Sequence, residues 1–421
     1  MTNNVTNFNI RMQNIAIVYP ETPDCNTQTD LDELQGLAST ANAKIAITFL
    51  QKRNVIDPVT VVGQGKLDEI KNSIGMFDGT DNEIDLVLFG TPLNATQRNA
   101  IEKKLDKPVI DRIDLILDIF AIRATTAEGK TQVELAQLTY NLANHPTDTK
   151  LSRQGAGIGT RGPGETKLET NKRAIRERMY KLRTRLKEIA ARRNLTRKNR
   201  VENKAFVVAL VGYTNAGKST LFNALTNQAV YADDKLFATL DTTVRSGEID
   251  GLSLLYIDTV GFINNLPHQL VDAFKSTLEE TTYADLVLHV LDVSDENLDM
   301  HARVTEQILT AELHVTAPVL RVYNKCDKPH PYFANDTDNA VFVSAKNGDG
   351  LDKLRDIIRL QMSSAYAKLT LQIPFEKSGE VLSQLGAINA TYEPCECVDC
   401  IKLAVTLKRQ YVDKFLQYVV I

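Results

Sequence analysis

The sequence predicts an α/β protein centred on a domain of the phosphate-loop class. Residues 212–219 read Gly-Tyr-Thr-Asn-Ala-Gly-Lys-Ser, the G-x-x-x-x-G-K-S pattern of a phosphate-binding loop (P-loop). An apolar run with strand character, residues 205–211, precedes this loop, and a helical pattern that includes Leu221 and Leu225 follows it. Further short polar boxes come next, each after an apolar strand. The strand–loop–helix context and the order of the boxes both favour this fold.

The P-loop residues have a chemistry suited to phosphate. Glycine permits a sharp turn and a close approach of the backbone to phosphate oxygens. Exposed N–H groups and a helix N-terminus supply positive potential. We expect Lys218 to bridge the β- and γ-phosphates and Ser219 to bind Mg²⁺. The predicted phosphate-binding residues are Gly212, Tyr213, Thr214, Asn215, Ala216, Gly217, Lys218 and Ser219.

A second box follows the strand at 254–257 and consists of Asp258, Thr259, Val260 and Gly261. We expect Asp258 to reach Mg²⁺ through water and the Gly261 N–H to face the γ-phosphate. A glycine-rich turn that binds nothing is the alternative for the P-loop, and the boxes that follow it, in the expected order and spacing, disfavour it.

Two later boxes predict guanine as the base. Asp327 can accept hydrogen bonds from guanine N1–H and the 2-amino group, and an unpaired carboxylate would penalise adenine. Lys325 can lie along the base, and a backbone N–H of residues 344–346 can reach guanine O6. The predicted residues are Asn324, Lys325, Cys326, Asp327, Ser344, Ala345 and Lys346. Each box is weak alone, but together they predict GTP binding.

The length of 421 residues allows two or three domains. The content is 43% apolar and 24% charged, which is ordinary for globular proteins. No apolar run approaches the ~20 residues of a membrane span, so we expect no integral membrane segment. The first residues lack a secretory signal, and five clustered cysteines do not suggest a disulfide framework. We expect a cytoplasmic monomer, with peripheral membrane association as an open alternative.

Residues 1–125 predict a small α/β domain with a mostly parallel sheet. Strands are expected at 15–18, 44–49, 59–62, 85–89 and 108–111, with helices that include 31–41 and 66–74. The sequence Gly63-Gln-Gly-Lys66 lies in a strand-to-helix turn. It predicts a tight turn, with a second site for a nucleotide such as ATP as the alternative.

Residues 126–200 predict a basic helical hairpin. The helices are expected at 131–144 and from about 165 to 194, with an apolar seam for an antiparallel pair. Residues 167–204 include 15 basic and 4 acidic residues and carry a net charge of +11. Because the whole chain has a net charge of −4, the remaining residues carry −15. This excess favours RNA over a merely solvated helix face. The candidate contacts, two of them in the glycine loop 153–165, are Arg153, Arg161, Lys172, Arg173, Arg176, Lys181, Arg183 and Arg185.

The segment 157–170, Gly-Ile-Gly-Thr-Arg-Gly-Pro-Gly-Glu-Thr-Lys-Leu-Glu-Thr, resembles the signature of the HflX family of translational GTPases. Residues 126–138 and 237–241 are similar to the same family. The resemblance implies an α/β plus helical-hairpin region ahead of a GTPase domain at 201–366. It also implies binding to the large ribosomal subunit and its rRNA, with roles in splitting or rescuing stalled ribosomes.

The resemblance also identifies a first switch made of Phe237, Ala238, Thr239, Leu240 and Asp241. It implies that Thr239 is the second Mg²⁺ ligand, although spacing alone leaves Thr242 and Thr243 open. With Lys218 and Gly261, Thr239 completes the expected catalytic set.

Two residues bear on turnover. Phe262 stands where many GTPases place a glutamine that orients water, which predicts slow intrinsic turnover and stimulation by a partner. Asn215 resembles the asparagine of K⁺-dependent GTPases, so K⁺ is a candidate second cofactor. The alternative is an asparagine that hydrogen-bonds its own loop.

Residues 367–421 predict a small α+β domain, with strands at 369–373 and 401–407 and helical turns at 381–385 and 411–418. Cys395, Cys397 and Cys400 form an incomplete zinc pattern, so we expect loop cysteines without metal.

The leading hypothesis is a GTP-hydrolysing switch on the large ribosomal subunit, acting in splitting, rescue or ribosome biogenesis. One alternative is a GTPase for RNA modification or maturation. Another is a non-catalytic RNA-binding protein that senses nucleotide, and a weaker one is ATP-driven RNA remodelling by the N-terminal region.

Overall fold

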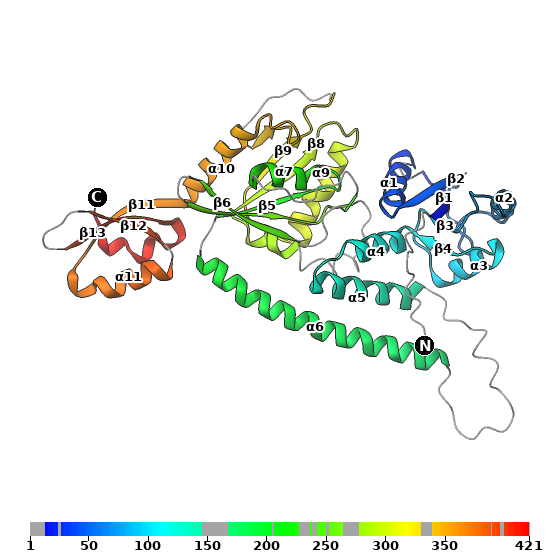
Figure 1. The fold of residues 1–421 in the computed structure, drawn as a ribbon, viewed down its shortest axis with the longest axis horizontal. Coiled ribbons are helices and arrows are strands. Elements are labelled where there is room, and N and C mark those ends of the chain that lie inside the picture. The colour runs from blue at the N-terminus through cyan, green and yellow to red at the C-terminus, as the bar shows by residue number, and fades with distance from the viewer. Residues whose placement is uncertain are drawn as a thin grey trace, which may run out of the picture. The chain divides into compact units, whose positions relative to one another are not determined.

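The computed structural model describes residues 13–23, 27–144, 167–203, 206–226, 236–237, 242–249, 252–263, 278–329, 339–388, 390–395 and 400–420 (Figure 1). It divides into two compact units. The first unit comprises residues 1–187, 233–241 and 265–275, and the second comprises 188–232, 242–264 and 276–421. The division differs from the four predicted segments, whose boundaries stay predictions. The predicted α/β class, with a GTPase-type sheet and a small C-terminal sheet, is confirmed.

The first unit contains a four-stranded parallel sheet of order β2-β1-β3-β4. The strands are β1 (Gln13–Glu21), β2 (Ala43–Lys52), β3 (Leu86–Phe89) and β4 (Val109–Asp111). The helices around it are α1 (Thr27–Thr40), α2 (Gln64–Gly75), α3 (Ala95–Leu105) and α4 (Arg112–Arg123). β1 is buried from Ile15 to Pro20, as expected for a central parallel strand covered on both faces.

The strand predicted at 59–62 is wrong, because these residues form a turn. Asp57 Oδ1 accepts hydrogen bonds from the N–H groups of Val59 (2.9 Å) and Thr60 (3.0 Å). Val61 has a φ of 65°, which a β-branched residue rarely adopts, and exchanges two backbone hydrogen bonds of 3.0 Å with Asp57. The aspartate therefore offers local hydrogen bonds that outweigh the strand preference of the valines.

The Gly63–Lys66 segment begins α2, with Gly63 as its N-cap. The Lys66 ammonium lies 2.7 Å from Glu69 Oε1 on the same helix. This geometry agrees with the tight turn that the sequence predicts.

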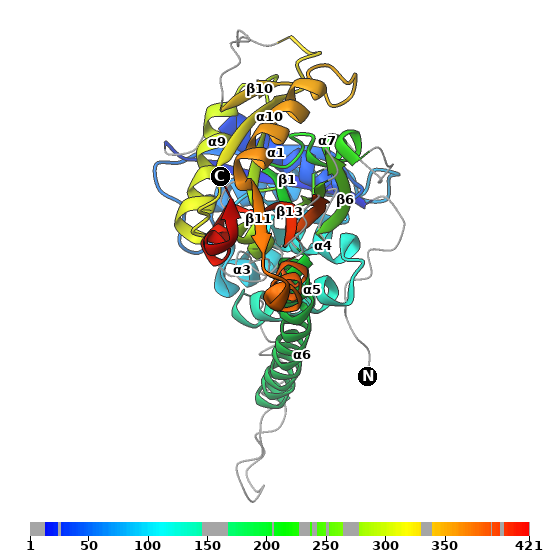
Figure 2. The same ribbon diagram turned by 90° about the vertical axis from the view of Figure 1, so that its left-hand side faces the viewer.

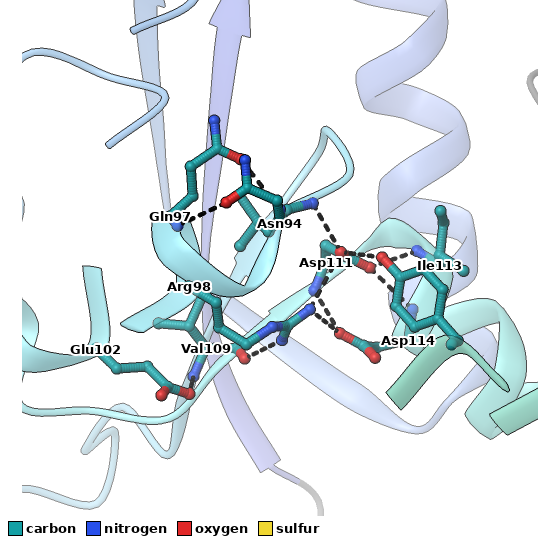
Figure 3. Close-up of polar contacts among 10 residues, drawn as sticks. Asn94, Gln97, Arg98, Glu102, Val109, Asp111, Ile113 and Asp114 are labelled. Carbon is teal, nitrogen blue, oxygen red and sulfur yellow. Dashed lines mark hydrogen bonds and ion pairs between the residues drawn. The ribbon is translucent and has the colours of Figure 1, made fainter. Parts of the chain in front are cut away.

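A buried polar cluster, made of Arg98, Asp111, Asp114 and Tyr140, ties this unit together (Figure 3). The Arg98 guanidinium lies 3.1 Å from Asp111 Oδ2 and 2.6 Å from Asp114 Oδ2, and it donates to the Val109 carbonyl at 2.6 Å. The Tyr140 hydroxyl, from α5 (Ala127–Asn144), donates to Asp111.

Asp111 also ends β4 and caps α4, since its Oδ1 accepts the N–H groups of Ile113 (2.9 Å) and Asp114 (3.0 Å). Burial, together with the nearby charge of Asp114, raises the pKa of Asp111. Its charge is therefore tolerated only because the surrounding donors are in place. The cluster links α3, β4, α4 and α5 through side chains that are largely shielded from water.

The helix α6 (Lys167–Asn203) is continuous and longer than predicted, and α5 begins four residues earlier than predicted. Figures 1 and 2 show α5 beside α6, and the guanidinium of Arg178 on α6 donates to Glu134 on α5 at 2.7 and 2.9 Å. Met179 and Leu182 of the predicted seam are buried. The helix pairing expected from the apolar seam is therefore present.

The second unit contains a six-stranded sheet of order β10-β9-β8-β5-β7-β6, parallel except for β6. The strands are β5 (Phe206–Gly212), β6 (Thr243–Ile249), β7 (Leu252–Asp258), β8 (Leu286–Asp292), β9 (Val319–Asn324) and β10 (Ala340–Phe342). The helices are α7 (Lys218–Thr226), α9 (Leu298–Gln307) and α10 (Leu351–Ala365), with short turns η1 (Glu279–Tyr283) and η2 (Ile308–Glu312). Apolar side chains of β5, α7, β8 and α10 form one continuous core.

A separate antiparallel sheet of order β12-β13-β11-β14 ends the chain. Its elements are β11 (Tyr366–Ile373), η3 (Phe375–Lys377), α11 (Ser378–Ala387), β12 (Thr391–Cys395), β13 (Ile401–Lys408), η4 (Arg409–Lys414), η5 (Leu416–Tyr418) and β14 (Val419–Val420). The strands and helical turns predicted here are confirmed. Cys400 is disulfide-bonded, which the expectation of loop thiols missed. The antiparallel pairing of β12 with β13 brings both ends of the cysteine-containing connection together.

None of the helices in the described parts of the chain combines the length and the hydropathy that a membrane span requires.

We expect Arg98→Met to destabilise the first unit by about 3–5 kcal/mol, because it leaves two buried carboxylates without their cation. Lys103→Met, an exposed position on the same helix, is the matched control and should change little. Urea unfolding followed by circular dichroism checks this. Equal unfolding midpoints for the two variants would contradict a stabilising role for the cluster.

Candidate nucleotide-binding site

The predicted boxes meet at one edge of the six-stranded sheet. The P-loop follows β5, Asp258 ends β7, Asn324 ends β9, and Ser344 lies two residues after β10. These strands are parallel, so their carboxyl ends lie at the same edge, where open α/β sheets bind ligands. Side chains from distant parts of the sequence are therefore neighbours here.

Two glycines of the P-loop are required by its geometry. Gly212 has a φ of 154°, and a Cβ there would lie 2.3 Å from the Val290 carbonyl oxygen. Gly217 has a φ of 86°, and a Cβ there would lie 2.3 Å from Asn324 Nδ2. Any side chain at either position would displace a neighbouring strand or loop.

Lys218 begins α7 and is buried within the loop that precedes it. Its ammonium donates to the carbonyls of Gly212 (3.0 Å) and Tyr213 (2.7 Å). Burial lowers the pKa of Lys218 to about 8. The structure thus holds a poorly hydrated cation beside a helix N-terminus, an arrangement that favours an anion.

Ser219 and Asp258 come together as predicted. The Ser219 hydroxyl donates to Asp258 Oδ2 at 2.7 Å, and Asp258 is 2% exposed. A hydroxyl and a carboxylate are oxygen donors of the kind that Mg²⁺ binds, so these residues fit the ion. Of the first switch, Phe237 is described and buried, whereas Ala238, Thr239, Leu240 and Asp241 lie outside the described residues.

The box that follows β7 is in contact with the P-loop. A Cβ on Gly261 would lie 2.8 Å from Thr214 Cγ2 and 3.0 Å from Lys218 Nζ, so only glycine fits. The Thr214 N–H donates to the Phe262 carbonyl at 2.7 Å, and the Phe262 N–H donates to the Gly212 carbonyl at 3.1 Å. The Thr259 hydroxyl donates to the Leu210 carbonyl at 2.7 Å.

Asn324 joins three of the predicted loops. Its Nδ2 donates to the Ala216 carbonyl of the P-loop at 3.0 Å, and its Oδ1 accepts the N–H of Ala345 at 3.0 Å. It is 2% exposed. Its side chain therefore sets the spacing between the phosphate loop and the two loops predicted to bind guanine.

The two predicted base contacts each have a local partner. The Ser344 hydroxyl donates to Asp327 Oδ1 at 2.7 Å, and this hydrogen bond lowers the pKa of Asp327. Lys325 Nζ lies 2.7 Å from Asp292 Oδ2. Asp292 was not among the predicted residues, although its place at the end of β8 was a usable signal.

His301 and Asp295, which the sequence analysis did not single out, form a second group next to Tyr213 of the P-loop. The Tyr213 ring stacks on the His301 imidazole with centroids 3.6 Å apart, and His301 Nδ1 lies 2.7 Å from Asp295 Oδ2.

Asn215 is exposed, has a φ of 60°, and its side chain forms no hydrogen bond with any residue that the structure describes. The alternative in which Asn215 bonds its own loop is therefore not seen.

The basic residues of α6 form an exposed face. Arg173, Arg176, Lys181, Arg183 and Arg185 are exposed, and Lys172 is half-buried. Arg173 Nε lies 4.0 Å from Glu177 Oε1 of the same helix. The remaining two candidates, Arg153 and Arg161, lie outside the described residues.

Comparison with family models gives three consecutive matches. Residues 28–121 match "GTP-binding GTPase N-terminal", residues 123–200 match "GTP-binding GTPase Middle Region", and residues 207–325 match "50S ribosome-binding GTPase".

Individual relatives match over most of the chain. The GTPase HflX of Caldanaerobacter subterraneus is 45% identical over 352 residues, which cover 83% of this chain and 81% of the relative. That of Escherichia coli is 42% identical over 374 residues, covering 86% and 85%. Among solved structures, the SsGBP–GDP complex has 26% identity and a TM-score of 0.49, covering 84% of this chain and 99% of that one. The chain belongs to the HflX family of GTPases and is a GTP-hydrolysing enzyme.

Proposed function

We propose that this GTPase is a nucleotide-controlled switch that binds the large ribosomal subunit and acts in splitting or rescuing stalled ribosomes. The observation that carries the proposal is the exposed basic face of α6 in a chain that also holds a P-loop site. The family description of residues 207–325 as a 50S ribosome-binding GTPase and the HflX relatives support it. Ribosomal RNA is the polyanion that such a basic helix fits.

The reaction is in-line attack of water on the γ-phosphate, which breaks the bond from the γ-phosphorus to the bridging oxygen. Lys218 and the P-loop N–H groups bind and neutralise the β- and γ-phosphate oxygens. Ser219 and Thr239, with Asp258 acting through a water molecule, would hold Mg²⁺, and the ion would add to this neutralisation. The Gly261 N–H donates a hydrogen bond to the γ-phosphate. Loss of this phosphate on hydrolysis therefore releases both the first switch and the loop that contains Gly261.

Guanine specificity follows from the loop that Asn324 holds. Ser344 keeps Asp327 ionised and oriented, and the carboxylate accepts the two guanine donors. Adenine lacks these donors and would leave the carboxylate unpaired.

An RNA-maturation GTPase remains the second candidate, because the same basic face would fit free RNA. The non-catalytic alternative is set aside, since the chain belongs to a family of GTPases.

We expect Asp327→Ala to weaken GTP binding by about 10- to 100-fold, because the variant removes two hydrogen bonds to a charged group. Asp352→Ala, a highly exposed carboxylate on α10, is the control and should bind GTP normally. Titration with a fluorescent GTP analogue measures both. Unchanged GTP affinity in Asp327→Ala would mean that guanine is recognised elsewhere.

We expect large ribosomal subunits, and not small ones, to stimulate GTP turnover. Replacing Arg176 and Arg183 by Gln removes two exposed charges from α6. Removing one lysine or arginine that binds a phosphate should reduce the steepness of log K against log salt by about 1, so the double variant should reduce it by about 2. Lys103 and Arg303, both exposed on other helices, give a double-Gln control of equal charge.

Basal turnover without ribosomes should be the same in both double variants. Stimulation by the small subunit instead, or an unchanged salt slope, would contradict the proposed interface. Tight binding to free RNA without stimulation by either subunit would favour RNA maturation.

We expect faster GTP turnover in KCl than in NaCl, because Asn215 offers an exposed amide oxygen with no competing hydrogen bond from the described residues. Asn215→Ala should equalise the two salts while retaining GDP binding. Turnover that is the same for the native chain in both salts would remove K⁺ as a cofactor.

A further inference from the structure

The hydrolysis site contains an unusual hydroxyl group. Thr214 is 6% exposed, and its Oγ1 is buried without a hydrogen-bond partner among the residues that the structure describes. Leaving a buried donor or acceptor unpaired costs about 1–3 kcal/mol, and folded proteins keep few such groups. An unpaired hydroxyl in the P-loop of an enzyme therefore needs an explanation.

Other threonines of the same unit do pair their hydroxyls. Thr259 donates to the Leu210 carbonyl at 2.7 Å, Thr226 to Phe222 at 2.8 Å, and Thr281 to Leu278 at 2.6 Å. A carbonyl acceptor is thus the usual solution for a buried threonine in this sheet and its helices. Thr214 differs although its own N–H is paired, with the Phe262 carbonyl at 2.7 Å.

The Thr214 methyl group lies against Gly261, whose N–H is proposed to bind the γ-phosphate. A Cβ placed on Gly261 would lie 2.8 Å from Thr214 Cγ2, 2.9 Å from Thr214 Cα and 3.0 Å from Lys218 Nζ. Thr214, Gly261 and Lys218 therefore converge on one point. Under the proposed function, two of these three contact the γ-phosphate.

The residue after Gly261 cannot supply a polar side chain. Phe262 is 4% exposed, carries no hydrogen-bonding group on its ring, and is held to the P-loop through its backbone. In many GTPases the side chain at this position orients the attacking water. In this chain another group must orient the water.

We infer that the Thr214 hydroxyl is a further catalytic residue, which orients the attacking water against the γ-phosphate. A hydroxyl has one donor and two acceptor sites, so it can donate to a γ-phosphate oxygen and accept from the water. A 120° rotation about χ1 moves Oγ1 to the present position of the methyl group and the methyl group to that of Hβ, which brings Oγ1 towards Gly261.

In this step the water oxygen bonds to the γ-phosphorus, and the bond to the bridging oxygen breaks. The proton of the water passes to a γ-phosphate oxygen, GDP and phosphate leave, and Thr214 is unchanged. The inference rests on the proposed function of the P-loop site, but not on ribosome binding.

Three variants of the full-length chain test the inference. Thr214→Val keeps the shape and removes the hydroxyl, Thr214→Ser keeps the hydroxyl, and Thr226→Val removes a hydroxyl that pairs within α7. Single-turnover GTP hydrolysis without ribosomes gives the rate, and GDP binding and circular dichroism report on the fold. GDP with aluminium fluoride serves as a probe of the transition state.

We expect Thr214→Val to lower the hydrolysis rate by about 10- to 100-fold and to weaken binding of GDP with aluminium fluoride but not of GDP alone. Thr214→Ser retains the hydroxyl, and Thr226→Val removes one that lies away from the reacting atoms, so both variants should stay within about threefold of the native rate.

A native rate in Thr214→Val would overturn the inference. So would a Thr214→Ser variant as slow as Thr214→Val, or a loss of GDP binding in Thr214→Val, because either result would assign the residue to packing. Binding of the large subunit is measured separately and should be unaffected, so failure of the ribosomal proposal would be distinguishable.

Discussion

The side-chain amide of Asn324 connects three loops that are far apart in the sequence. Its two hydrogen bonds span 108 and 21 residues, and they join the P-loop to both loops predicted to bind guanine. Because the amide is buried, each bond is made without competition from water. The same amide group excludes any residue other than glycine at position 217, because it occupies the place that a Cβ there would take.

This connection works only because the strands below it are parallel and end at one edge. The sheet gives each loop a fixed origin, and the amide then sets the distance between them. The loops that are proposed to bind phosphate and base are thereby held at one spacing. The loop after β7, which contains Gly261 and Phe262, joins the same arrangement through backbone hydrogen bonds to the P-loop. A change at the proposed γ-phosphate position would therefore act directly on these two residues.

Buried charged side chains connect the elements of the first unit, whereas the neutral amide of Asn324 connects the loops of the second unit. Arg98, Asp111, Asp114 and Tyr140 lie at the junction of β4 with three helices. A buried ion pair rarely adds more stability than apolar packing would, but removing one partner is costly. The cluster therefore favours one arrangement of these elements over others. The basic face of α6 remains exposed, in a segment (residues 167–204) that carries a net charge of +11 while the rest of the chain carries −15.

The sequence by itself determined the class of fold, the order of the boxes, the pairing of α5 with α6 and the basic face. These features depend on local backbone demands, such as glycine in a P-loop, and on periodic patterns of apolar residues. The strand expected at 59–62 failed for a local reason too, because hydrogen bonds to Asp57 override the preference of valine. Only the tertiary structure decided the partners of Asn324, the pairing of Lys325 with Asp292, and the unpaired hydroxyl of Thr214 within the described part of the chain. These depend on which side chains meet across strands distant in the sequence, and no local pattern records such contacts.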